Sequence, residues 1–257
     1  MIVFKNKEEF ENFFSNIKTK KIDNYLEFKK FDNYEENKIL IVAPHACKGK
    51  YLLNIKGKNM LIPGGEKNVA ELTKIASYNV GCALLISYVP RFEADFARGI
   101  EDLGKGLVLN FLVEGKRIPI KIHTNKKYLN LLKKFHKIIE KIDPSFILSF
   151  HGTFIRNFDA LFGFGKEKRF ISGKKLAFKF RREVVKKMKE MKEDVKVGIA
   201  KKIYVGRSEY ILNTHVKGNK KGVLVEFAKK GRIPFPSIKY QILATVIAET
   251  AKKYCIE

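Results

Sequence analysis

The feature that most constrains the fold is a short, continuous apolar run, Ile39–Ala43, which stops at Pro44 and is followed at once by His45. Runs of this length without polar residues suit a strand that is covered on both faces of a sheet. Open α/β sheets bind their ligands at the carboxyl ends of such strands. His45 is therefore expected at a functional edge of the sheet.

The rest of the chain alternates between strand-like and helix-like segments. Further strands of the same sheet are predicted over residues 83–89, 146–150, 195–200 and 222–227. Apolar residues at helical spacing predict helices over residues 66–78, 125–142, 174–191 and 237–253. This alternation predicts an α/β sandwich, with polar groups collected at the ends of its strands.

The N-terminal segment, residues 1–36, is predicted as a helical packing element of a single domain that spans residues 1–257. Within it, residues 7–30 are expected to form a helix, because Phe10, Phe13 and Ile17 recur on one face. An aromatic stripe of this kind is typical of packing against a core. We therefore expect it to stabilise the domain without contacting a ligand.

Two hairpins are predicted from turn signals and alternation. One hairpin pairs residues 51–56 with residues 59–62, and a second pairs residues 107–113 with residues 117–123. The first of these lies between His45 and Glu66. Residues 202–216 have no clear period and are interpreted as an irregular strand.

His45 and Glu66 are candidate ligands of a metal ion. A catalytic zinc site needs three protein ligands of the imidazole or carboxylate type and one open position, so a third ligand must come from elsewhere. The alternative is that His45 ends a strand and Glu66 only stabilises the N-terminus of the following helix. His151, which follows the apolar run 146–150, repeats the pattern of His45. The other histidines are expected to have no role in the chemistry, although the last is a reserve ligand: His123, His136 and His215.

Two arginines and one buried acid are candidates for binding and catalysis. Arg91 and Arg98 follow the strand at residues 83–89 and are suited to binding a carboxylate or stabilising an oxyanion. The alternative is an ion pair with Asp95 that fixes the loop. Glu226 lies inside the apolar run 222–227, where burial would raise its pKa towards the value wanted in a general base.

The net charge of +25 fits either a nucleic-acid partner or an acidic substrate. The lysines are spread along the chain, and the sequence contains no zinc-finger spacing, helix-turn-helix signal or RNP aromatic motif. A lysine-rich, archaeal-like composition is also typical of hyperthermophile proteins. We therefore favour a solvated basic surface and keep a nucleic-acid partner as the less favoured alternative.

The remaining composition bears on compartment and redox state. The chain has three cysteines, Cys47, Cys82 and Cys255, and no CxxC spacing, so neither a disulfide framework nor a zinc ribbon is expected. No apolar stretch is long enough for a membrane helix, and the N-terminus gains charges too early for a signal peptide. These features predict a cytoplasmic protein without a membrane partner. No feature indicates an oligomeric state.

Taken together, the motifs resemble those of a known group of enzymes. They are APH, a glycine-rich turn followed by EKNVAEL, SYVPRFEADFAR, SFHGT and GVLVEF, which together span residues 39–227. This pattern is similar to that of N-formylglutamate amidohydrolases and poly-γ-glutamate hydrolases, relatives of the zinc carboxypeptidases. The chain departs from the pattern at Ala97 and Val225, where Asn and Gln are usual. The segment between His45 and Glu66 is also longer than expected for this group.

The resemblance implies a fold, a cofactor and a set of roles. The fold would be a three-layer α/β sandwich with a mixed, mostly parallel central sheet, as in zinc carboxypeptidases. Zn²⁺ would be held by a set of three residues: His45, Glu66 and His151. Glu226 would activate water, and Arg98, with Arg91 as the other candidate, would hold the substrate's carboxylate or the carbonyl oxygen in the transition state.

The predicted function is zinc-dependent hydrolysis of a C–N amide bond in a small or peptide-like acidic substrate that bears a carboxylate. Two alternatives belong to other classes. One is hydrolysis of an RNA-linked ester, as in aminoacyl-tRNA deacylases, although the chain has only His151-Gly152 where those enzymes carry HHG. The other is a non-catalytic basic module that binds nucleic acid.

Overall fold

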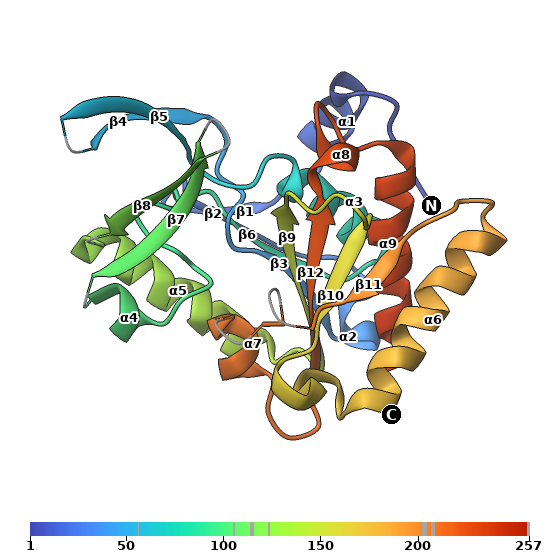
Figure 1. The fold of residues 1–257 in the computed structure, drawn as a ribbon. Coiled ribbons are helices and arrows are strands. Elements are labelled where there is room, and N and C mark those ends of the chain that lie inside the picture. The colour runs from blue at the N-terminus through green and yellow to red at the C-terminus, as the bar shows by residue number, and fades with distance from the viewer. Residues whose placement is uncertain are drawn as a thin grey trace.

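The computed structural model describes residues 1–55, 57–104, 106–113, 116–122, 124–201, 205–206 and 209–255. Its main element is an eight-stranded sheet with the order β1-β2-β6-β3-β9-β12-β10-β11 (Figure 1). In that order the strands are Lys20–Ile22, Leu26–Lys30, Ala83–Ser87, Ile39–Ala43, Phe146–Thr153, Lys221–Ala228, Ala160–Gly163 and Val197–Ile199.

The centre of the sheet is parallel and its margins are mixed. β6, β3, β9 and β12 run in one direction, whereas β2 joins β6 and β10 joins β12 in antiparallel fashion. All five residues of β3 and of β6 are buried, as expected for strands that are covered on both faces. The prediction of a mixed, mostly parallel sheet is confirmed.

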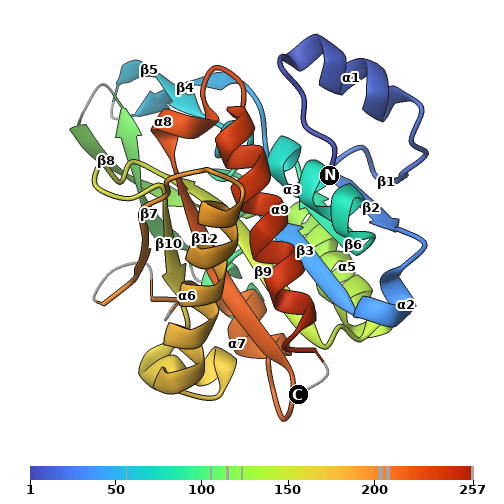
Figure 2. The ribbon, with the colours of Figure 1, turned by 90° about the vertical axis from the view of Figure 1, so that its right-hand side faces the viewer.

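Helices cover both faces of the sheet. α3 (Val69–Val80), α6 (Lys174–Glu190) and α9 (Ile238–Lys252) pack with sheet residues such as Ile41 and Val225. α5 (Lys126–Ile142) and α7 (Tyr210–His215) pack with residues of the opposite parity, such as Leu40 and Leu224. Figure 2 shows α6 and α9 in front of the sheet and α5 behind it. The predicted three-layer sandwich is thus confirmed.

The remaining helices are short. They are α1 (Lys7–Ser15), α2 (Tyr34–Asn37), α4 (Ile100–Gly104), α8 (Lys229–Arg232) and a 3₁₀ helix, Lys166–Ile171. α8 lies directly after β12, at the carboxyl end of the sheet (Figure 1). None of the helices in the described ranges is long and apolar enough to cross a bilayer.

The prediction of a continuous helix over residues 7–30 is wrong in its second half. α1 ends at Ser15, and residues 20–30 form the hairpin β1–β2 at the edge of the sheet. Phe10 and Phe13 do face a common aromatic cluster with Phe4, but no apolar spacing continues the helix beyond it. Asp23 and Asn24 instead adopt φ values of 50° and 59°, a left-handed turn that these residue types tolerate.

Two further expectations need correction. Residues 202–216 are not an irregular strand where the structure describes them, because Tyr210–His215 form α7; residues 202–204 and 207–208 lie outside the described ranges. The sequence predicts no strand or helix between residues 151 and 173, whereas the structure has β10 and the 3₁₀ helix there. In both cases long-range packing decides the structure, and local periodicity carries little signal.

The two predicted hairpins are confirmed. β4 (Lys50–Ile55) pairs with β5 (Lys58–Pro63), and β7 (Leu107–Val113) pairs with β8 (Lys116–Ile122). They project together beyond the main sheet (Figure 1). Between them lies a small apolar cluster of its own, which includes Ile62, Leu109, Phe111 and Ile122.

Candidate metal centre

His45 lies just beyond the carboxyl end of β3 and is almost completely buried, with 2% of its surface exposed. The chain is fixed here by a hydrogen bond from the Ala46 amide to the Ser87 carbonyl, 2.9 Å, which ties the end of β3 to β6. His45 Nδ1 lies 3.2 Å from Glu66 Oε1, and His45 Nε2 lies 2.7 Å from Asp95 Oδ1. The strand therefore delivers the imidazole between two carboxylates.

Glu66 returns to His45 because the β4–β5 hairpin closes on itself. The Gly64 amide donates to the Gly49 carbonyl (3.1 Å), and the Glu66 amide donates to the His45 carbonyl (2.6 Å). Gly65 makes this approach feasible, since a Cβ there would overlap the His45 carbonyl oxygen. The helix begins later than predicted, because α3 starts at Val69 and Glu66 lies in the preceding loop.

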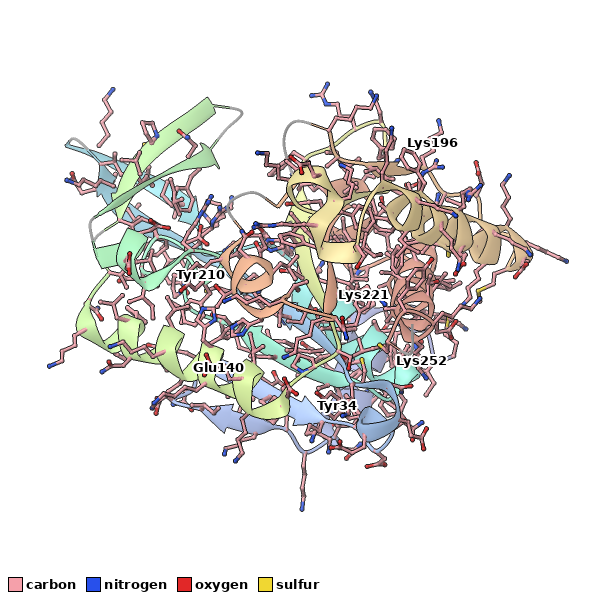
Figure 3. All side chains as sticks on the ribbon, turned by 90° about the horizontal axis from the view of Figure 1, so that it is seen from below. Tyr34, Glu140, Lys196, Tyr210, Lys221 and Lys252 are labelled. Atoms are coloured by element: carbon pink, nitrogen blue, oxygen red, sulfur yellow. The ribbon has the colours of Figure 1, made fainter. Side chains whose placement is uncertain are left out.

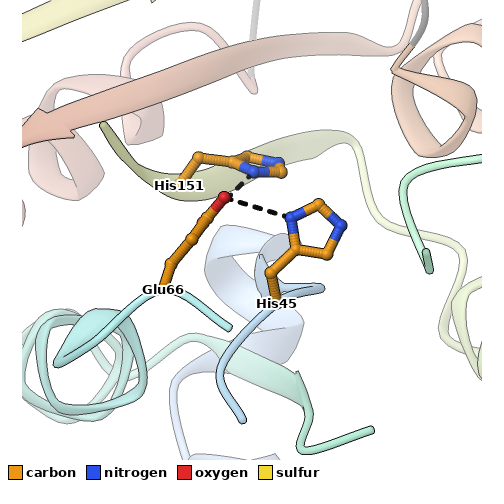
Figure 4. A group of neighbouring side chains, drawn as sticks. All are labelled: His45, Glu66 and His151. Atoms are coloured by element: carbon orange, nitrogen blue, oxygen red, sulfur yellow. Dashed lines mark hydrogen bonds and ion pairs between the residues drawn. The ribbon is translucent and has the colours of Figure 1, made fainter. Parts of the chain in front are cut away.

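His151 is the third member of the group and lies within β9, where only 4% of its surface is exposed. Its Nδ1 is 3.4 Å from Glu66 Oε2, and the rings of His45 and His151 have their centroids 5.0 Å apart (Figure 4). The Gly152 amide donates to the same Glu66 oxygen at 2.9 Å. One donor atom from each of the three residues lies within 4.8 Å of the others.

The distances from the two Nδ1 atoms to the Glu66 carboxylate, 3.2 and 3.4 Å, are compatible with a shared ion. Zinc bonds to N and O at about 2.0–2.1 Å, which puts neighbouring ligand atoms about 3.3 Å apart. Each imidazole points Nδ1 at Glu66 and Nε2 at a second carboxylate. The second partner is Asp95 for His45 and Glu209 for His151, the latter at 3.4 Å. Such outer carboxylates orient the ring and fix its tautomer in metal sites.

The charges of the group are strongly coupled. Burial disfavours the charged form of each member, but Glu66 and Glu209 still raise the pKa of His151 well above its ordinary value. Asp95 and Glu66 likewise raise the pKa of His45, and the two histidines hold the pKa of Glu66 well below its usual range. A cation between these atoms would replace the protons as the source of positive charge. Its affinity is expected to fall as the pH is lowered.

Glu226 lies beside this group on the neighbouring strand. β12 runs parallel to β9 with Glu226 directly opposite His151, and residues in register on parallel neighbours point to the same face. The carboxyl is 7% exposed. Burial, together with the negative charges of Glu66 and Glu209, raises its pKa to about 7, although His151 opposes the shift. A carboxylate with this pKa can accept and return a proton near neutral pH.

Arg91 and Arg98 both turn towards Asp95. Arg91 Nε is 3.0 Å and Arg98 Nε 3.8 Å from Asp95 Oδ2, so the ion pair that fixes the loop is present. The side chain of Arg91 keeps 28% of its surface exposed, and its charge is felt by both Glu66 and Glu226. The charge of Arg91 therefore acts on two members of the candidate site, Glu66 and Glu226.

His136 and His215 do not join the group. His136 Nδ1 lies 2.8 Å from His215 Nε2, and the ring of Tyr210 packs edge-on against His136 at 5.2 Å. Tyr210 is labelled on α7 in Figure 3. The reserve ligand His215 is thus part of the contact between α5 and α7, as is His136. His123 lies outside the described residues.

The buried His136 gives a testable pH dependence of stability. Burial, with the nearby His215, lowers its pKa to about 3. The unfolded chain takes up a proton at this histidine below about pH 6.5, whereas the folded chain does not until about pH 3, so stability falls as the pH drops through this window. We expect His136→Leu to flatten the decline by about 1.4 kcal/mol per pH unit. Chemical denaturation between pH 6.5 and 5 checks this, and equal slopes in both proteins would contradict it.

No family model matches the sequence, and none of the curated proteins does. Among solved structures, N-formylglutamate amidohydrolase from Ralstonia eutropha JMP134 matches with a TM-score of 0.58 and 11% identity, over 90% of this chain and 97% of that chain. The chain shares the fold of this amidohydrolase. A gene product of Agrobacterium tumefaciens matches with a TM-score of 0.56 and 10% identity, over 90% of this chain and 93% of that chain.

Three residues around the candidate metal centre of this chain were not found from the sequence. Ser149 Oγ lies 3.1 Å from His151 Nε2 and donates to Glu209 Oε1 at 2.9 Å. Ser149 could have been found, because it stands two residues before His151 on the same face of a strand. Glu209 lies in a segment without a clear period, and Arg232 comes after the predicted strand 222–227 rather than at its end, so only the folded chain brings them here.

Asp95→Asn tests whether the outer carboxylate supports the metal centre. The variant removes the negative charge that holds the Nε2–H of His45, so the ring loses its preferred orientation. We expect zinc affinity to fall about 10- to 100-fold, the range typical of such outer partners. Competition with a chromophoric chelator measures the affinity, and thermal melting of the metal-free proteins controls for stability. Unchanged affinity would show that His45 is oriented without Asp95.

Proposed function

We propose that this protein is a zinc-dependent hydrolase that cleaves a C–N amide bond in a small or peptide-like substrate bearing a carboxylate. The observation that carries the proposal is the convergence of His45, Glu66 and His151 beside Glu226. Three ligands and an adjacent carboxylate are what metal-assisted hydrolysis requires. The fold shared with an N-formylglutamate amidohydrolase supports the same reaction class.

Each residue of the centre would have a distinct task. Zinc at this position supplies Lewis acidity, which polarises a carbonyl group and lowers the pKa of water. Glu226 takes a proton from the attacking water and passes it to the departing amine nitrogen, for which a pKa of about 7 is suitable. Asp95 and Glu209 keep the two imidazoles in the tautomer that presents Nδ1.

The arginines would supply specificity for an acidic substrate. A guanidinium can bind a carboxylate or a developing oxyanion through paired N–H groups. We assign the catalytic oxyanion role to Arg98 and the substrate carboxylate to Arg91, whose side chain is 28% exposed and whose charge interacts with Glu66 and Glu226. We also propose, as predicted from the sequence, that the protein is cytoplasmic.

Elemental analysis of the purified protein is the first test. We expect one zinc per chain, removed by a chelator and restored by added zinc. Turnover should be screened with N-acyl amino acids and γ-glutamyl peptides, before and after chelation. A protein that takes up no zinc, or that hydrolyses these amides equally well after chelation, would overturn the proposal.

A further inference from the structure

Arg232 is a buried cation to which the proposed mechanism gives no task. It ends α8, directly after β12, and only 3% of its surface is exposed. Its guanidinium makes hydrogen bonds to two backbone carbonyls from different parts of the chain. Nε donates to Phe227 O at 3.2 Å, and Nη1 donates to Lys67 O.

The same guanidinium also packs against β9. A Cβ at Gly152 would overlap its central carbon and both terminal nitrogens, so the absence of a side chain at this position is what admits Arg232. Gly152 is in turn the residue whose amide donates to Glu66 Oε2. Arg232 therefore lies directly behind the peptide that binds a proposed metal ligand.

These three contacts follow a common rule. Lys67, Gly152 and Phe227 are the residues that immediately follow Glu66, His151 and Glu226 in the chain. The Arg232 side chain thus contacts the residue that follows each of the two proposed ligands and the residue that follows the proposed base. The three segments are otherwise separate in sequence, and a planar group with five donors can bind several of them at once.

A reciprocal contact fixes Arg232 itself. Asn68 Nδ2 donates to the carbonyl oxygens of Arg232 and Pro234, the latter at 2.6 Å. Asn68 has a φ of 62°, in the left-handed region that Asn tolerates better than most residues. The segment that carries Glu66 and the segment that carries Arg232 therefore donate hydrogen bonds to each other.

We propose that Arg232 is a positioning residue that keeps Glu66, His151 and Glu226 in their mutual geometry by binding the residue that follows each of them. The inference rests on the proposed metal centre and adds a fixed support behind it. Burial lowers the pKa of Arg232, and the negative charges of Glu66 and Glu226 oppose this shift.

The test compares zinc affinity in Arg232→Met, Arg232→Lys and a matched control. Arg181 is the control because its Nε donates to the Val197 carbonyl at 2.6 Å, a bond of the same kind between α6 and β11. We expect Arg232→Met to weaken zinc binding at least about 10-fold, as loss of an outer support does in metal sites. Arg181→Met should stay within about two-fold of the parent, and Arg232→Lys should recover part of the loss, because one ammonium cannot reach all three segments.

The readouts separate this inference from the proposed function. Zinc affinity is measured by chelator competition, and the zinc-induced rise in Tm relative to each metal-free protein removes differences in basal stability. If the parent binds zinc and Arg232→Met binds it equally well, only the role of Arg232 is overturned. The same holds if Arg181→Met weakens binding as much as Arg232→Met does. If the parent binds no zinc, the metal centre and the role of Arg232 both fail. Should Arg232→Met not fold, Arg232→Lys decides, and parent-like affinity in it overturns the proposal.

Discussion

Glu226→Gln is expected to leave zinc bound and to reduce turnover about 100- to 10,000-fold, the usual contribution of a general base. The amide of Gln has nearly the same shape as the carboxylate but cannot accept a proton. Glu226 is not one of the three converging ligands, so the metal should remain. Elemental analysis and kcat at saturating zinc measure the two effects separately.

A second buried acid provides the control for Glu226→Gln. Glu27 is 1% exposed and pairs with Lys74 at 2.9 Å near the edge of the sheet. Glu27→Gln should cost stability without changing kcat. A Glu226→Gln protein with parental turnover, or one that has lost its zinc, would contradict the assigned role.

His151→Ala is expected to lose both zinc and turnover. The substitution removes one of three ligand atoms, and it leaves Glu66 and Glu209 buried without the imidazole that pairs with them. Zinc content after dialysis against a chelator should fall from one per chain to nearly zero. Activity on any amide that the parent hydrolyses should fall to the level of the chelated parent.

His215→Ala is the matched control for this experiment, since His215 pairs with His136 and not with the ligand group. It should retain one zinc per chain. A double replacement of His45 and His151 that still bound zinc stoichiometrically would rule out the site altogether. Equal zinc loss in His215→Ala and His151→Ala would show that the loss reflects general unfolding.

The ends of the buried strands were the predictable part of the site. Apolar runs fixed the positions of β3 and β9, and each run presents its histidine at the edge where parallel strands collect ligands. Glu226 was recognisable as an acid inside such a run. The position of Glu226 opposite His151 follows from the pairing of β9 with β12, which no local pattern specifies.

Other parts depended on contacts that the sequence does not encode locally. His45 and Glu66 are 21 residues apart, and no local pattern shows that they meet, because it is the closed hairpin between them that brings them together. For Arg91 and Arg98 the sequence offered two roles. The structure shows the ion pairs with Asp95, and the contact with a substrate stays a prediction. The N-terminal helix was predicted too long because its aromatic spacing was extended into residues that pair as strands.

The base of the β4–β5 hairpin is closed by backbone hydrogen bonds, so the length of the hairpin does not determine the positions of His45 and Glu66. Because the Gly49–Gly64 and His45–Glu66 backbone bonds lie below the first strand pair, the outer turns near Gly57 can lengthen or shorten without shifting either ligand. A change in the length or surface of this projection is therefore expected to alter which molecules can approach His45 and Glu66 while leaving both side chains in place.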